Sequence, residues 1–153
     1  MLLRNVLQGR PQQLLTAAPA APIEEVMGLF IDKNLCCLPV VEAEGKPVGM
    51  IKGLDILSAI RRAKGDYTGL KVKDVMRAIS VEGKLDDDTA FIADLMEKKN
   101  ICHIPVVKGE KMVGFFSLQD IYRMRMEDME AEIHTLTDML NKRDKSGDYD
   151  SFA

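Results

Sequence analysis

The chain has 153 residues and a formal net charge of −3. This length fits one domain, or two small domains that must pack together because each alone would bury too little surface. The acidic balance argues against nucleic-acid binding, and no apolar run reaches membrane-spanning length or resembles a secretory leader. We therefore expect a cytoplasmic protein with neither nucleic acid nor membrane as a partner.

Residues 1–63 are predicted to form one unit with the order strand, helix, strand, strand, helix. Its first helix begins near Pro22, because proline is favoured at a helix start. Residues 42–46 form the turn between the second and third strands. The last helix stops near Arg62, and the polar, glycine-containing residues 64–71 form a linker.

Residues 72–126 are predicted to repeat this order. A short strand covers 79–81 and ends at Gly83, and Asp86, Asp87 and Asp88 then supply the N-cap and first-turn carboxylates of a helix. That helix runs to about Lys99. Its apolar face comprises Phe91, Ile92, Leu95 and Met96.

Two strands and a long helix complete the second unit. The strands cover 104–107 and 112–117, and Asp120 lies in the first turn of the helix that follows. Residues 127–142 extend this helix, and 143–153 form a polar tail. Apolar residues along the helix alternate spacings of four and three: Tyr122, Met126, Met129, Ile133, Leu136 and Leu140. This heptad seam indicates a dimer or partner contact, or an amphipathic helix that covers its own domain.

The two units are copies of one another. Residues 34–41 (NLCCLPVV) recur as residues 100–107 (NICHIPVV), an offset of 66 residues. The match continues downstream, where Asp55 and Ile56 correspond to Asp120 and Ile121. Because repeated units bury their faces against each other, we expect pseudo-twofold symmetry with a cleft between the copies.

No catalytic motif is present, and we expect no enzyme activity and no catalytic cofactor. Two groups of side chains resemble metal ligands. Asp86, Asp87 and Asp88 form an acidic triplet that helix capping also explains. The second group lacks the spacing typical of zinc sites: Cys36, Cys37, Cys102 and His103.

Ser117 and Asp120 are the informative polar pair. A carboxylate with two acceptor oxygens can bind both hydroxyls of a ribose, and a serine beside free N–H groups at a helix start can receive a phosphate. Asp120 is also explained as a simple helix cap. Asp55 at the same place in the first copy favours the nucleotide clamp.

The combined pattern resembles the CBS domain, and two copies in tandem resemble the CBS pair known as a Bateman module. The resemblance rests on the duplication, on Pro-Val-Val, on Val-Gly-x-x-Ser-x-x-Asp-Ile, and on 72–76 (VKDVM), and it covers about Leu3 to Arg125. It implies an α+β fold of two β-α-β-β-α units packed sheet to sheet with pseudo-twofold symmetry, plus an extended C-terminal helix. It also implies two clefts that bind adenosine compounds.

The resemblance implies two unequal nucleotide-binding sites. Asp120 would hold the ribose and Ser117 the phosphate of the first site, with the adenine near five residues of the first copy: Leu15, Thr16, Leu35, Cys36 and Cys37. The second site would comprise Asp55, Lys52, Val81, Ile101, Cys102 and His103. Lys52 replaces the family's Ser/Thr there, and it either neutralises a phosphate or fills the cleft. His103 either faces a phosphate or satisfies a hydrogen bond at the end of its strand.

The resemblance implies a non-enzymatic sensor that binds AMP, ADP or ATP, forms a homodimer and regulates a protein partner whose identity the sequence does not give. Two other functions remain open. One is a dimerising scaffold that binds no nucleotide, and the other is a metal-responsive module.

Overall fold

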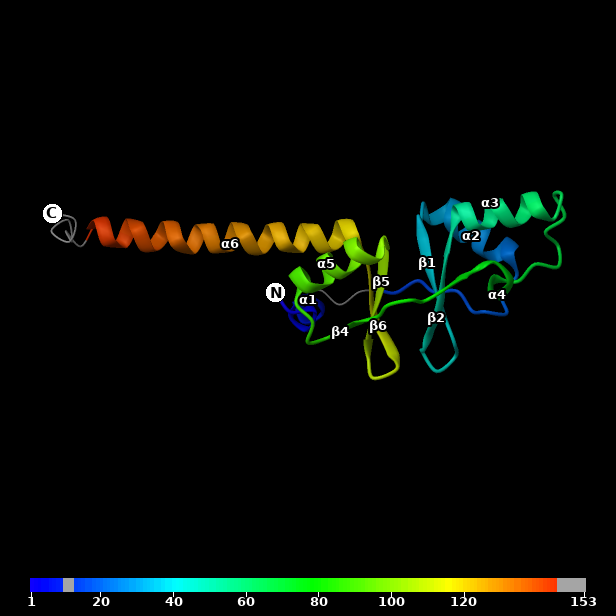
Figure 1. Cartoon of the computed structure of the whole chain (residues 1–153), viewed down its shortest axis with the longest axis horizontal. Coiled ribbons are helices and arrows are strands. Elements are labelled where there is room, and N and C mark those ends of the chain that lie inside the picture. The colour runs from blue at the N-terminus through cyan, green and yellow to red at the C-terminus, as the bar shows by residue number, and fades with distance from the viewer. Residues whose placement is uncertain (10–12, 146–153) are drawn as a thin grey trace.

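The computed structural model describes residues 1–9 and 13–145, which form two three-stranded sheets and six helices (Figure 1). The elements in chain order are α1 (Leu3–Gly9), α2 (Ile23–Lys33), β1 (Cys37–Val41), β2 (Pro47–Lys52), α3 (Gly53–Arg62), α4 (Val72–Val75), β3 (Arg77–Ala78), β4 (Gly83–Lys84), α5 (Thr89–Lys99), β5 (His103–Lys108), β6 (Lys111–Ser117) and α6 (Leu118–Lys145).

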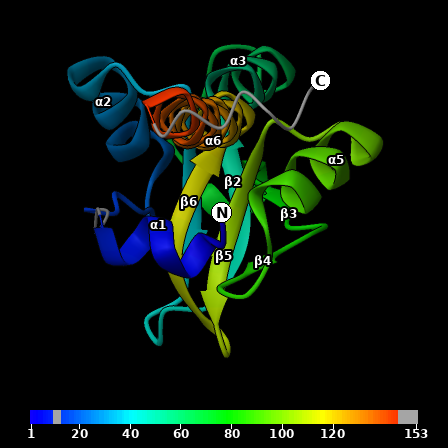
Figure 2. The same ribbon diagram turned by 90° about the vertical axis from the view of Figure 1, so that its left-hand side faces the viewer.

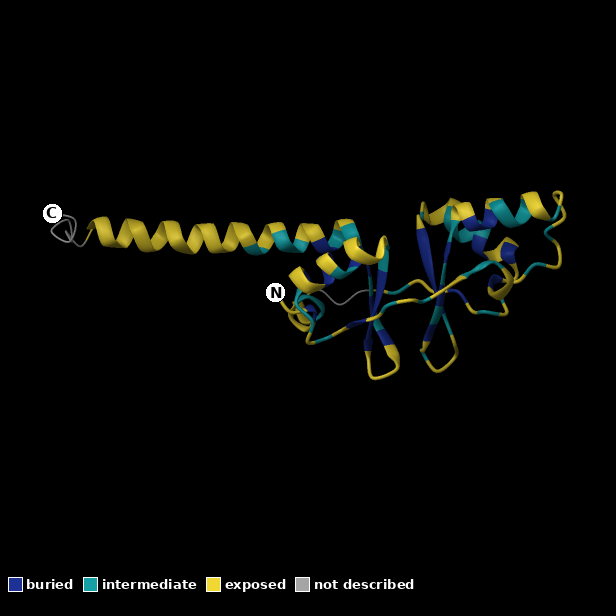
Figure 3. Cartoon of the chain, viewed as in Figure 1, coloured by how far each residue is buried: buried dark blue, intermediate teal, exposed yellow. Residues whose placement is uncertain are grey.

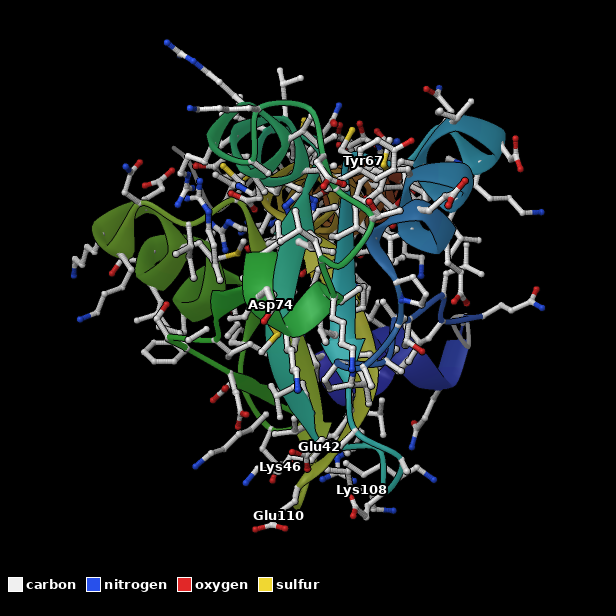
Figure 4. All side chains as sticks on the ribbon, turned by 90° about the vertical axis from the view of Figure 1, so that its right-hand side faces the viewer. Glu42, Lys46, Tyr67, Asp74, Lys108 and Glu110 are labelled. Atoms are coloured by element: carbon white, nitrogen blue, oxygen red, sulfur yellow. The ribbon has the colours of Figure 1, made fainter. Side chains whose placement is uncertain are left out.

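The two sheets lie face to face (Figures 1 and 2), with β3 antiparallel to the second hairpin strand of the first sheet and β4 parallel to the first hairpin strand of the second. In each half an antiparallel hairpin, β1–β2 or β5–β6, is flanked by a two-residue strand. The turns of the hairpins meet at one end of the molecule, where Met112 N–H donates to the Gly45 carbonyl over 2.9 Å. Figure 4 shows their charged residues gathered there. The predicted α+β fold of two similar units packed sheet to sheet is confirmed.

Each core is completed by a short helix from outside the helix–strand–strand–helix unit that it serves: α1 precedes the first half in the chain but packs into the second, and α4 follows the first half and packs into it. Leu3 of α1 is 0% exposed and packs into the core of the second half with Ile92, Met96 and Ile104. Val72 of α4 packs in the same way into the core of the first half. Sequence reasoning did not identify either helix. Because each core includes a short helix from outside its own helix–strand–strand–helix unit, neither core is complete without the connecting segments.

The ends of the first helix in each half follow local chemistry. Asn34 and Asn100 end α2 and α5 in the left-handed region, with φ of 51° and 53°. Asparagine tolerates that conformation better than most residues. The predicted cap at the start of α5 is Asp88, which accepts a hydrogen bond from Ala90 N–H at 2.8 Å. Asn34 and Asn100 are equivalent in the repeat, whereas Pro22, the counterpart of Asp88, makes no side-chain cap.

The predicted buried face of α5 is wrong at one position. Ile92 and Met96 are buried, but Phe91 is largely exposed and Ala93 takes its place in the core. Leu95 is partly buried. Helical spacing alone allows either neighbouring stripe, and packing against β5 and α6 selects the one centred on Ile92.

The predicted strand over 79–81 is also wrong. Residues 77–78 form β3, which pairs with β2 in the first sheet, and residues 83–84 form β4, which pairs with β5 in the second sheet. Gly83 therefore begins a strand instead of ending one. The segment between them crosses from one sheet to the other, so its residues pair with neither. In the first half the strand expected near Leu15 is reduced to an isolated bridge between Ala17 and Val40.

The last helix, α6, projects away from the two sheets (Figure 1). Its first turns pack against α5 and β6, whereas the projecting part is exposed on all sides (Figure 3). Met129, Ile133 and Leu136 are 50–63% exposed. Within the chain, then, the heptad seam does not cover its own domain beyond the first turns. Of the predicted tail over 143–153, residues 143–145 instead continue α6, because the helical pattern does not stop at 142, and the rest lies outside the described residues.

We predict that Leu3→Ala lowers the free energy of unfolding by about 2–5 kcal/mol, because it leaves a cavity in the second core. Denaturant unfolding measures this loss. The adjacent Leu2 is partly exposed, and Leu2→Ala serves as the matched control with a far smaller effect. Equal effects of the two substitutions would contradict the role given to Leu3.

Candidate functional site

The two carboxylates singled out in the sequence occupy equivalent strand–helix junctions. Ser117 N–H donates to Asp120 Oδ2 at 2.9 Å, and Asp120 N–H donates back to Ser117 Oγ at 3.0 Å. In the first half Lys52 N–H donates to Asp55 Oδ2 at 3.0 Å. Each carboxylate thus caps a helix through one oxygen. The other oxygen of each carboxylate, Oδ1, is left for a different partner.

Asp120 keeps its second oxygen accessible. The nearest cation is Arg123 Nη1, 3.5 Å from Oδ1, on the exposed surface of the same helix. The Asp120 side chain is 38% exposed. A carboxylate oxygen in this position can accept hydrogen bonds from a hydroxyl-bearing ligand.

An apolar cavity of about 240 Å³ lies between the halves, and residues from both copies line it. The first half contributes Leu15, Leu35 and Cys37, and the second half contributes Phe115. Because side chains alternate along a strand, Phe115 and Ser117 project from the same face of β6. The structure therefore brings three of the predicted first-site residues into one cavity with Phe115, whereas Ser117 and Asp120 are not among its lining residues. Thr16 and Cys36 are exposed and are not among the lining residues.

Phe115 is a site residue that sequence reasoning missed. A signal for it existed, since it stands two positions before Ser117 on a strand whose side chains alternate. The duplication obscures it, because the equivalent residue in the first copy is Met50.

The residues predicted for the second site are only partly brought together. Asp55 lines a surface cavity of about 570 Å³ with Ser58, Arg62 and Arg77. Val81 lines a different cavity, beside Lys46 and Pro47. Ile101 packs against the second core, and the Cys102 carbonyl accepts a hydrogen bond from Leu118 N–H at 2.8 Å. The structure therefore places Asp55 and Val81, two residues of the predicted second site, in different cavities.

His103 lies at the junction of the two halves. It pairs with Ser117 across the hairpin and stacks on Phe115 with a ring-centre distance of 5.5 Å. Burial lowers its pKa most, the positive charge of Lys52 lowers the pKa further, and Asp120 raises it. Lys52 and His103 are thus near each other, as the predicted second site requires. The buried Nδ1 has no hydrogen-bond partner within the described part of the chain.

The two metal-ligand candidates have other structural explanations. Burial raises the pKa of the Cys37 thiol to about 11, so the thiolate that binds metals is disfavoured. Asp86 pairs with Arg4, Asp87 accepts a hydrogen bond from Lys84 N–H, and Asp88 caps α5. Within residues 1–9 and 13–145 no three His, Cys, Asp or Glu side chains are grouped to hold a metal ion.

The chain belongs to the CBS domain family, whose model matches residues 11–62 and 72–127. Its sequence is 29% identical over 133 residues to the uncharacterized protein MJ1404 of Methanocaldococcus jannaschii. This match covers 76% of the chain and 32% of MJ1404, so the chain spans about a third of that relative's length.

Solved structures of CBS domain pairs share the fold. The CBS domain pair of protein MJ0100, in complex with 5′-methylthioadenosine and S-adenosyl-L-methionine, is 27% identical with a TM-score of 0.64, over 81% of this chain and 98% of that one. The structure of CBSX2 in complex with AMP is 19% identical with a TM-score of 0.70, over 84% and 98% of the two chains. In the described part of the chain no helix is both long and apolar enough to cross a membrane.

We predict that His103 makes stability depend on pH. Folding lowers its pKa below the ordinary value of 6.5, so the unfolded chain binds the proton more readily. The contribution of neutral His103 to the free energy of unfolding is then fully present above pH 6.5 and is lost as the pH drops through the folded-state pKa. His103→Gln should therefore lose less of its thermal midpoint than the wild type between about pH 7.5 and pH 5.5.

The control for this measurement is His134→Gln on the exposed part of α6. It removes the same kind of titratable group without a buried environment, and its pH dependence should follow that of the wild type. Parallel curves for His103→Gln and the wild type would contradict the assignment.

Proposed function

We propose that this chain is a non-enzymatic regulatory module that binds an adenine nucleotide at the Ser117–Asp120 site and signals its presence to a protein partner. The observation that carries the proposal is the apolar cavity between the halves, whose lining residue Phe115 lies two positions before Ser117 on the same face of β6. The partly exposed Asp120 carboxylate follows at the start of α6. This combination provides a flat apolar surface for a base and a polar end for a sugar and phosphate.

Each residue of the site has a distinct role in this proposal. Asp120 Oδ1 accepts hydrogen bonds from the ribose hydroxyls. Ser117 Oγ receives the first phosphate at the N-terminus of α6, where the helix dipole favours a negative charge. Leu15, Leu35 and Phe115 hold the adenine. A bound phosphate would also raise the pKa of His103, against the effect of its burial.

The ligand class is adenosine compounds. The complex of MJ0100 with two such compounds supports this class, because that protein shares both the family and 27% sequence identity with this chain. The complex adds S-adenosylmethionine and methylthioadenosine to AMP, ADP and ATP as candidates. A thermal-shift panel of these compounds, NAD and magnesium tests the function, since a specific ligand stabilises the folded state by mass action.

Signalling follows from the position of the site. A ligand that touches Leu15 in one half and Asp120 in the other favours one packing of the two halves over another. It can shift that equilibrium only by its difference in affinity for the two arrangements. The α6 helix begins at Asp120's own turn, so a change there is passed directly to the projecting part of α6. A response to no compound in the panel would instead favour the scaffold, and a response to magnesium alone would favour the metal-responsive module.

We further propose that the projecting part of α6 binds a second copy of this chain. Its exposed apolar residues keep heptad spacing over Met126 to Leu140. In a parallel pair, Arg125 of one helix would face Glu130 of the other, with opposite charges at the flanking positions. Exposed Ile31, Leu54 and Leu57 on α2 and α3 add apolar surface for self-association.

We predict that Asp120→Ala weakens binding of the nucleotide at the first site by roughly 10- to 100-fold, because it removes hydrogen bonds to a charged acceptor. Isothermal titration calorimetry measures the loss, and circular dichroism confirms that the fold is kept. Asp94→Ala removes an exposed carboxylate that pairs with Lys98 on α5, and it should bind normally. Unchanged affinity in Asp120→Ala would refute the ribose assignment.

We predict that truncation after Arg125 converts the dimer to a monomer at micromolar concentration. Ile133→Asp should have the same effect in the full chain, since Ile133 lies on the seam and is exposed in the single chain. Thr135→Asp, off the seam on the same helix, is the matched control. Light scattering coupled to size exclusion gives the mass, from which the number of chains per particle follows. If both seam variants remain dimers, α6 is ruled out as the dimer contact.

A further inference from the structure

The two carboxylates that the duplication places at equivalent positions differ in one contact. Asp120 and Asp55 both accept a backbone N–H through Oδ2, at 2.9 and 3.0 Å. Their Oδ1 atoms differ, since Asp55 Oδ1 accepts a hydrogen bond from Arg77 Nε at 2.7 Å, whereas among the described residues Asp120 Oδ1 is paired with Arg123 Nη1 at the longer distance of 3.5 Å. The Asp55 side chain is 9% exposed and that of Asp120 is 38% exposed.

Arg77 reaches Asp55 because of the crossing segment between the sheets. It lies on β3, which pairs with β2 through Met50↔Arg77, and its guanidinium extends along the sheet to the first turn of α3. Figure 4 shows neighbouring Asp74 on α4, at the end of the molecule opposite to α6. Asp74, Arg77 and Asp55 line one cavity. The contact thus joins α3 to the segment that connects the two halves.

Within residues 1–9 and 13–145, no cation from the other connecting segment pairs with Asp120 as Arg77 pairs with Asp55. Alignment of α1 with α4 places Gln8 opposite Arg77, and the 66-residue offset of the following helices places Pro11 opposite it. Neither residue carries a charge. Arg123, the cation nearest to Asp120, belongs to the same helix and points along its exposed surface. The asymmetry between the two carboxylates therefore originates in the sequence at position 77.

A guanidinium on Oδ1 uses the acceptor that a ribose would need. An arginine–carboxylate hydrogen bond is charge-assisted and stronger than a bond from a neutral hydroxyl. A ribose at Asp55 must displace it, and the displaced guanidinium would remain beside the ligand. Lys52, in place of the serine of the other half, adds a second positive charge at the same junction.

We propose that Arg77 acts as a built-in competitor for the ribose position of Asp55, so that the chain binds one nucleotide, at Asp120, and not two. Arg77 is a specificity-determining residue in this scheme. The inference rests on the proposed function. Arg77 would also couple ligand binding to the contact between the halves, because any ligand that displaces Arg77 from Asp55 would free the segment that joins the halves.

The test uses the full chain with the first site removed by Asp120→Ala. AMP and S-adenosylmethionine are titrated separately by calorimetry into the wild type, Asp120→Ala, Asp120→Ala/Arg77→Ala and Asp120→Ala/Arg77→Met. The methionine variant keeps the aliphatic packing of the arginine stem and removes only the guanidinium. Asp120→Ala/Arg62→Ala is the matched control, since Arg62 lines the same cavity and its loss leaves the Arg77–Asp55 contact in place.

The expected result is one binding event in the wild type, a single event weakened roughly 10- to 100-fold in Asp120→Ala and in the Arg62 control, and one regained event in both Arg77 variants with affinity at least tenfold above that of Asp120→Ala. Two events in the wild type, or no regained event in either Arg77 variant, would overturn the role of Arg77 and leave the proposed function intact. Absence of binding in every chain would overturn the proposed function, and this inference with it.

Discussion

Neither half of this molecule can close its own hydrophobic core with the residues between its first and last main helix. A unit of about 60 residues buries too small a fraction of its surface to be stable by itself. The structure solves this by adding one short helix to each core, α1 through Leu3 and α4 through Val72, both fully buried. Because α1 joins the second core while the chain passes on to the first, the halves are held together by the path of the backbone as well as by the contact of their sheets.

The same arrangement creates the candidate site. The described residues that precede α2 lie against both halves. Leu15 from the first half and Phe115 from the second therefore line one cavity. A ligand there is sensitive to the relative position of the halves, since it touches both. This gives a physical basis for regulation without a catalytic group.

Duplication fixes the backbone geometry of the two junctions but not their chemistry. The capping hydrogen bonds of Asp55 and Asp120 agree to within 0.1 Å, because both follow from the same turn between a strand and a helix. The second oxygen of each carboxylate meets whatever side chain the crossing segment supplies. In the first half that side chain is Arg77, so two sites that are equal in backbone become unequal in function. The length of α6 adds a second asymmetry, since the equivalent helix α3 ends at Arg62.

Many features of this protein are determined by short stretches of its sequence. The repeated NLCCLPVV and NICHIPVV segments, the asparagine helix ends and the Asp55 and Asp120 positions depend on neighbouring residues, and they predict the two-unit fold and the two candidate carboxylates. The burial of Ala93 in place of Phe91, the split of the predicted strand between two sheets, the packing of Leu3 in the distant half, and the contacts of Phe115 and Arg77 were not predicted. Each of these depends on which surfaces meet across the two halves, and a linear pattern carries periodicity along one element but not the partner that the element packs against.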